Sequence, residues 1–125
     1  MDSQRTYIPI YNSNGEAAAY LVYPYIFNRR GEWIGFVNRD REVYSVYGHY
    51  VGWLSDDPRI LCKRSYPFNK SKIDPPPDPG KIHAPPWGPL APLMPELGFD
   101  VVDILSEQPD RLPTLDSGEF KEDLD

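Results

Sequence analysis

The sequence predicts an all-β protein: an antiparallel meander of repeated short hairpins, followed by a proline-rich extended segment and a short C-terminal helix. The first observation is a repeat, because residues 11–21, 27–37 and 44–54 share one order of residue types. That order is aromatic, three turn-forming residues, Gly, three residues, Gly or Ala, aromatic, aliphatic. The second observation is proline, with nine of the 15 prolines falling between residues 75 and 95. No helix or sheet interior tolerates that density.

Each repeat is interpreted as a β-hairpin. The turn glycines Gly15, Gly31 and Gly48 stand 16 and 17 residues apart and supply the positive φ that tight turns need. The strands expected around them are residues 7–12 with 16–22, 23–28 with 32–37, and 41–46 with 49–54. A seventh short strand is expected over residues 59–63, in a fourth unit where Ser65 stands in place of a glycine.

The return strands of the hairpins predict a sheet that is apolar on both faces. Side-chain parity puts Ile34 with Phe36 on one face and Trp33 with Val37 on the other, and the other return strands follow the same rule. A half-solvated antiparallel sheet would be polar on one face. We therefore expect each face to be covered, one by the folded meander and the other by the C-terminal segment or by a second copy of the chain.

Two further glycines, Gly35 and Gly52, lie in the middle of predicted strands. Glycine there costs about 0.5–1 kcal/mol relative to alanine. Their presence indicates either the close approach of a ring or of a second backbone, or a bulge that curves the sheet. Both interpretations can hold together.

The chain divides into three expected parts. These are a β-hairpin repeat domain (1–72), a proline-rich extended segment (73–96), and a short helix with an acidic tail (97–125). The helix is expected within residues 97–107, where Val101, Val102 and Leu105 share a face.

The segment after Lys72 is unusually apolar for a linker. It carries Ile82, Trp87, Leu90, Leu93 and Phe99, whose burial would contribute about 1.5–3 kcal/mol for each fully buried side chain. We therefore expect residues 73 to about 105 to pack on the hairpin domain of the same or a neighbouring subunit. The alternative is that the proline run is a ligand for an SH3-like groove on another protein.

Charge and composition limit the classes of partner. Residues 1–72 hold ten Lys or Arg against seven Asp or Glu, whereas the rest of the chain holds three against twelve, for a total of −6. This balance argues against nucleic-acid binding, which needs a concentrated basic surface. The N-terminus resembles no secretory signal, the longest apolar run is too short to span a bilayer, and Cys62 is the single cysteine. The sequence predicts a cytoplasmic protein with no membrane association.

The reactive residues suggest no catalytic or metal site. Cys62 and His49 could form a nucleophile pair, and His49 with His83, Asp56 and Asp57 could supply metal ligands, but their spacing matches no known motif. Ser55 to Pro58 is typical of a turn. We therefore expect no catalytic residues, no metal and no cofactor.

The aromatic side chains are the remaining candidates for binding. Tyr and Trp offer contact area with a polar handle, and they could line a groove for a small ligand or a peptide, or pack the core and subunit contacts. The residues considered for binding or for an interface are Tyr20, Trp33, Phe36, Tyr50, Trp53 and Trp87.

The hairpin unit, with glycine after the turn and Gly-aromatic-aliphatic in the return strand, resembles the bacterial family of 4-fold beta-flower proteins. The resemblance extends over about residues 7–66, with Ala19 where the later units have glycine. It implies a four-fold homotetramer of small β-rich subunits and no assigned activity. The sequence thus predicts a non-enzymatic, oligomeric structural or interaction module. A small-ligand or peptide binder is the alternative, and an enzyme is the third hypothesis. A protein partner for the proline-rich segment is also open.

Overall fold

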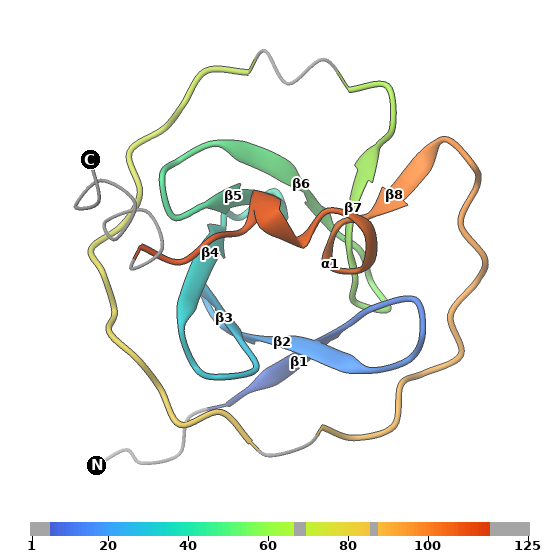
Figure 1. Ribbon diagram of the computed structural model, residues 1–125, viewed down its shortest axis with the longest axis horizontal. Coiled ribbons are helices and arrows are strands. Elements are labelled where there is room, and N and C mark those ends of the chain that lie inside the picture. Colours follow the sequence, from blue (N-terminus) through green and yellow to red (C-terminus); the bar gives the residue numbers. More distant parts are fainter. Residues whose placement is uncertain (1–5, 67–69, 86–87, 116–125) are drawn as a thin grey trace.

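The computed structural model describes residues 6–66, 70–85 and 88–115. Eight antiparallel strands form one curled sheet in which each strand pairs with the next along the chain (Figure 1). The strands are β1 (Ile8–Tyr11), β2 (Ala17–Val22), β3 (Tyr25–Asn28), β4 (Trp33–Val37), β5 (Glu42–Ser45), β6 (Tyr50–Leu54), β7 (Ile60–Lys63) and β8 (Val101–Asp103). The predicted meander of short hairpins is confirmed, and the acidic end from residue 116 lies outside the described residues.

One five-residue turn recurs around the sheet, and its hydrogen bonds explain the sequence pattern Asn-x-x-Gly-Glu. In residues 12–16 the Asn12 side-chain oxygen accepts bonds from the backbone N–H groups of Asn14 and Glu16, and its amide donates to the Glu16 carboxylate. The backbone N–H of Gly15 donates to the Asn12 carbonyl at 3.0 Å. Residues 28–32 repeat these bonds, and Ser45 takes the place of asparagine in residues 45–49.

The same five-residue turn also joins the second hairpin to the third, between β4 and β5. Its sequence is harder to recognise there because the turn glycine is absent. Residues 38–42 read Asn-Arg-Asp-Arg-Glu, so Arg41 occupies the glycine position and adopts a φ of 65°. Its guanidinium donates to the carbonyls of Leu54 and Ser55, at 2.8 and 2.7 Å. These two bonds offset the strain that a non-glycine residue carries in the left-handed region.

Because of bulges, some side chains do not lie on the faces of the sheet that strict alternation predicts. The pairing register shifts by one residue beside Ile10, Ile26 and Val43. Because one extra residue in a strand reverses the alternation that follows it, Ile34 and Val37 both face the shared core, whereas Trp33 and Phe36 both face the other side. Strict parity had paired Ile34 with Phe36 and Trp33 with Val37.

The shared core, which we call the inner cluster, draws on all eight strands and on the C-terminal end. Its largest members from the strands include Ile10, Ile26 and Ile60, and Ile104 and Leu112 close it from beyond the sheet. An outer cluster on the opposite face of β3 to β5 contains Phe27, Trp33, Phe36, Tyr44 and Val46. Both faces of the sheet are therefore buried, as the sequence predicts, and here a single chain covers them.

Both interpretations of the mid-strand glycines Gly35 and Gly52, a close backbone approach and a bulge, hold in the structure. A Cβ on Gly35 would lie 2.5 Å from the carbonyl oxygen of Tyr44, and one on Gly52 would lie 2.1 Å from that of Leu61. Each glycine also lies close to a register shift. On one side of each glycine the strand pairing is bulged, and on the other side the next strand is the second backbone that approaches closely.

The C-terminal helix is shorter than expected. Helix α1 spans Ile104–Glu107, and the preceding residues Val101–Asp103 form β8, which pairs with β7. Asp103 caps α1 by accepting a bond from the Ser106 backbone N–H, so the helix begins there. The β-branched Val101 and Val102 join the sheet, which stabilises a strand more than one additional helical turn would. A 3-10 turn, η1 (Pro109–Arg111), follows α1.

Residues 70–100, which we call the strap, contain no helix or strand in their described parts. The strap leaves the end of β7, runs around the outside of the sheet and returns to β8 (Figure 1). The Ile73 N–H donates to the Gly48 carbonyl and the Ile82 N–H to the Gly31 carbonyl, while Ala91 lies against Gly15 and the Asp100 carbonyl accepts from the Arg64 N–H. The strap therefore passes the three glycine turns in the order third, second, first, and then meets the end of β7 at Arg64.

The strap has a period of nine residues. Residues 73, 82, 91 and 100 are the points of contact, and nine residues of an extended proline-rich chain cover about 28 Å. The pairs Lys72-Ile73 and Lys81-Ile82 repeat at the same spacing. This recurrence is a sequence signal that the search for strands and turns overlooks, because it belongs to a segment without regular secondary structure.

Apolar docking of the strap is only partly as expected. Ile82 is half-buried against the outer cluster, but Leu90, Leu93 and Phe99 are 96, 100 and 92% exposed. Within one chain these three side chains do not pack on the hairpins, because the strap is held mainly through its backbone and turns them outward. Packing on a neighbouring subunit stays a prediction. Trp87 lies outside the described residues.

Candidate functional site

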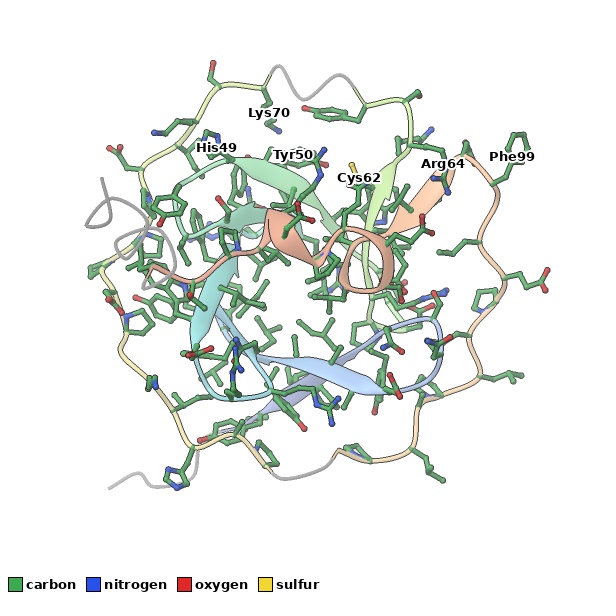
Figure 2. All side chains as sticks on the ribbon, viewed as in Figure 1. His49, Tyr50, Cys62, Arg64, Lys70 and Phe99 are labelled. Atoms are coloured by element: carbon green, nitrogen blue, oxygen red, sulfur yellow. The ribbon has the colours of Figure 1, made fainter. Side chains whose placement is uncertain are left out.

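The side chains considered for nucleophilic catalysis do not form a pair. Cys62 on β7 is buried in the inner cluster, where burial raises the pKa of its thiol. His49 lies exposed in the turn between β5 and β6, and the two are separate in Figure 2. A buried thiol with a raised pKa is a poor nucleophile near neutral pH.

The aspartates between β6 and β7 have structural partners. Asp57 forms an ion pair with Arg59 at 2.7 Å and accepts a hydrogen bond from Ser55. Burial alone would raise the pKa of Asp57, but the hydrogen bonds from Arg59 and Ser55 outweigh it and hold that pKa below its usual value. The Asp56 side chain is fully exposed, and its Oδ1 lies 3.8 Å from Arg41 Nη2. Within the described residues no three His, Cys, Asp or Glu side chains are grouped to hold a metal ion.

A buried polar network, which we call the seam, joins the first strand pair to the last. Asp103 at the end of β8 accepts hydrogen bonds from the Ser13 backbone N–H and hydroxyl, both at 2.6 Å. Arg59, whose side chain is 3% exposed, donates to Ser13 Oγ and to the Pro95 carbonyl, each at 3.0 Å. The backbone N–H of Tyr11 also donates to the Pro58 carbonyl. These bonds bring the two ends of the sheet together and hold the strap against it.

An open groove of about 850 Å³ lies beside the seam, between the first hairpin turn and the strap. Its walls are Ser13 to Gly15 on one side and strap residues 90–99 on the other, and Arg59 and Asp103 form part of its floor. Both charged floor residues have their hydrogen bonds satisfied by the protein. The groove is therefore a site for apolar contact at its rim more than for ion binding at its base.

The aromatic residues considered for binding have different surroundings. Tyr20, Trp33 and Phe36 are buried, Trp33 with its indole N–H donating to the Gly35 carbonyl at 2.7 Å. Tyr50 and Trp53 are half-buried. The burial of the first three favours packing over contact with a ligand.

A second polar cluster lies where the strap begins. Lys70 Nζ contacts Glu42 Oε2 at 2.7 Å and stands 4.8 Å from the centre of the Tyr50 ring and 6.0 Å from that of Tyr44 (Figure 2). The Lys70 hydrogen bond, followed by that from Asn38, lowers the pKa of Glu42, and the bond to Glu42 raises the pKa of Lys70. Burial raises the pKa of both tyrosines. The sequence reasoning missed Glu42 and Lys70, which are far apart in the chain and match no motif.

The fold and these sites define a class: a small all-β protein of four antiparallel strand pairs, with its polar side chains engaged in holding the fold together. The chain belongs to the 4-fold beta flower protein family, whose sequence description matches residues 8–102. No curated protein and no solved structure gives a match. Within the described residues no helix is long and apolar enough to cross a membrane.

The match runs through the strap to β8, so the family unit includes the proline-rich segment. Four strand pairs, β1–β2, β3–β4, β5–β6 and β7–β8, follow one another around a single chain. A four-fold arrangement is thus present within one copy. The homotetramer that the family name implies stays a prediction about assembly.

Proposed function

We propose that the protein is a non-enzymatic structural and interaction module that associates with further copies of itself through the second half of the strap, residues 88–100. The observation that carries the proposal is the exposure of Leu90, Leu93 and Phe99, each more than nine-tenths exposed within ten residues. Single exposed apolar side chains are common on soluble proteins, but a group of large ones on one segment is typical of an interaction surface.

A second copy of the chain fits this surface because it is self-complementary. The three apolar side chains stand at the rim of the groove of about 850 Å³, so each copy carries both the projecting residues and the depression that can receive them. Phe99 points away from the sheet at the edge of the molecule (Figure 2). Two copies related by a two-fold axis can exchange such contacts, and symmetric contacts of this kind are the commonest among oligomers.

The family supports a small oligomeric β domain, and its four-fold description favours a tetramer among the assemblies. The apolar faces of the sheet do not contribute to this argument, because the chain covers them itself. Assembly through the strap would leave the hairpins unchanged. The oligomer is therefore expected to dissociate without unfolding.

Light scattering at micromolar concentration tests the proposal. We expect a mass that is a multiple of the monomer mass of 14.4 kDa, and a shift to the monomer mass in the triple variant Leu90→Ser, Leu93→Ser, Phe99→Ser with its melting temperature retained. Tyr47→Ser, which removes a partly exposed aromatic side chain from the third hairpin turn, is the matched control and keeps the assembly. A wild-type mass near 14.4 kDa overturns the proposal. Binding of a different protein through the same three residues would identify a heterologous partner instead.

The non-enzymatic role rests on the surroundings of the reactive side chains. We expect Cys62→Ala, His49→Ala and Asp57→Asn each to leave the biological phenotype intact once folding is verified by circular dichroism. Loss of a native activity in one folded variant would make an enzyme the better hypothesis. We also propose a cytoplasmic location, supported by the single, buried cysteine, and fractionation of the native host tests it.

A further inference from the structure

The start of the strap places a positively charged ammonium group against tyrosine rings and a carboxylate. Lys70 Nζ lies 4.8 Å from the centre of the Tyr50 ring, within the distance at which a cation is attracted by the ring face. The Tyr44 ring is 6.0 Å away, and Tyr66 extends the aromatic wall, with its ring centre 5.0 Å from that of Tyr50. Glu42 supplies the negative charge at 2.7 Å.

The walls of this cluster are held in place without Lys70. Glu42 closes the five-residue turn of residues 38–42, where its other oxygen accepts bonds from Asn38 Nδ2 at 2.8 Å and Tyr44 Oη at 3.2 Å. Phe36 stacks on Tyr44 with ring centres 5.5 Å apart, and Tyr44 meets Tyr50 edge to face at 5.7 Å. Strands β4 to β6 and the turn of residues 38–42 thus preorganise Glu42, Tyr44 and Tyr50. Tyr66 joins them from the turn after β7, where its N–H donates to the Lys63 carbonyl, and the strap contributes the cation.

The Lys70 ammonium is bound at this site weakly enough for a free cation to displace it. The Lys70 side chain is 37% exposed, and its ion pair with Glu42 is of the kind that solvent screens. The lysine competes with free cations chiefly because it is attached to the same chain, which gives it a high effective concentration.

We propose that Glu42, Tyr44, Tyr50 and Tyr66 form a binding site for an alkylated ammonium group, such as a quaternary or methylated amine, and that Lys70 occupies it in the unliganded protein. A quaternary ammonium has no N–H donors and is less strongly hydrated than the ammonium of lysine, so it loses less on leaving water. Rings grouped with a carboxylate are the surroundings in which such cations are recognised. Lys70 then acts as an internal competitor. The site is independent of the self-association surface on the far part of the strap.

The test is a titration of the full-length protein with choline, followed through the NMR signals of the tyrosine rings at constant ionic strength. We expect Lys70→Ala to bind choline at least about tenfold more tightly than the wild type, since the internal competitor is gone. Lys72→Ala, which removes an exposed lysine two residues away, is the matched control and should resemble the wild type. Adding Tyr50→Leu or Glu42→Gln to Lys70→Ala should abolish binding.

Equal affinity of Lys70→Ala and wild type, or no saturable shift in folded Lys70→Ala, overturns the proposal. Circular dichroism verifies the fold of each variant. If Lys70→Ala does not fold, the wild type decides: excess choline should displace the Lys70 side chain and move its ε-CH₂ signal toward that of a free lysine. An unmoved ε-CH₂ signal at saturating choline would also overturn it. Sodium chloride at equal concentration distinguishes displacement by choline from simple screening of the ion pair.

Discussion

The two halves of the strap are attached to the same set of hairpins by different means. The first half, residues 70–85, is bonded to turn glycines through the N–H groups of Ile73 and Ile82 and buries part of Ile82. The second half, residues 88–100, passes the first hairpin without a backbone bond to its turn, with Ala91 against Gly15 and Gly88 against Ala17. Side chains of the body hold it: Tyr11 at Pro89, Arg59 at Pro95 and Arg64 at Phe99. Its large apolar side chains point outward.

This difference shows which interactions can attach a proline-rich segment to a sheet. Proline provides no N–H, so the few available donors have to meet acceptors where the partner backbone is accessible. The turn glycines expose their carbonyls because they have no side chain, and they leave room for the strap carbonyls that follow. Side chains of the body donate to strap carbonyls in both halves, Tyr25 to Pro77 in the first and Arg59 to Pro95 in the second. Where the backbone bond to a turn glycine is absent, the large apolar side chains of the strap are exposed and available for other contacts.

The largest effect is expected where a buried charge holds the second half. Arg59→Met leaves the partly buried Asp57 without its cationic partner and removes the bonds to Ser13 and Pro95, so we expect a loss of about 3–5 kcal/mol in the free energy of unfolding. Chemical denaturation measures it. Arg64→Met is the control, because Arg64 also donates to a strap carbonyl, that of Phe99 at 2.9 Å, but its side chain is half-exposed and its ion pair with Glu107 is worth under about 1 kcal/mol. Equal losses in the two variants would mean that the seam does not anchor the strap.

Alanine at the turn glycines compares the two halves directly. In Gly31→Ala the new Cβ would lie 1.9 Å from the Ile82 carbonyl oxygen, whereas in Gly15→Ala its nearest neighbour is the Ala91 side chain at 3.8 Å. Both glycines have positive φ, which costs alanine about 1–2 kcal/mol. Gly15→Ala should lose only this amount, and Gly31→Ala about 2 kcal/mol more through the clash. Equal melting temperatures of Gly15→Ala and Gly31→Ala would show that the strap does not contact the second turn closely.

Serine substitutions on the strap test the difference in burial. Ile82→Ser should reduce stability by about 1–2 kcal/mol, since its side chain is half-buried against the outer cluster. Leu90→Ser and Leu93→Ser should each change the stability of the monomer by less than about 0.5 kcal/mol, because both side chains are fully exposed. Thermal melts below the concentration of self-association measure this. A loss at Leu93 as large as that at Ile82 would contradict the exposed position of the second half.

The smallest effect concerns pH at the start of the first half. The pKa of Glu42 is lowered in the folded protein, so its contribution is present above about pH 4.3 and is lost as pH falls through the folded value. The pKa of Lys70 is raised, so its contribution is present below about pH 10.4 and is lost as pH rises through the folded value. The difference in stability between wild type and Lys70→Met should be under about 1 kcal/mol and confined to this window. A constant difference from acid to alkaline pH would assign the effect to packing.

The sequence predicts the parts of the fold that depend on local chemistry. The turn glycines and the alternation of strands are local, so the first seven strands and the family could be recognised. Bulges beside Ile26 and Val43 depend on how neighbouring strands meet, and strict parity therefore put Ile34 and Trp33 on the wrong faces.

Long-range pairing accounts for what could not be predicted. Val101 and Val102 are compatible with a helix by periodicity and become a strand only because β7 offers an open edge. The Lys70–Glu42 cluster and the Asp103–Ser13 seam join residues far apart in the chain, and neither follows a spacing rule. The outward direction of Leu90 and Leu93 depends on where the strap backbone is bonded, which composition does not reveal.

The seam also sets the order in which the protein can be completed during synthesis. Asp103, the partner of Ser13, is made some 90 residues after it. The hairpins pair residues that are close in sequence, so they can form early. The two ends of the sheet can join only after the strap and β8 have been translated. Until then β7 keeps an unpaired edge, and the inner cluster lacks Val102, Ile104 and Leu112. The nascent chain is thus most exposed to aggregation just before β8 is translated.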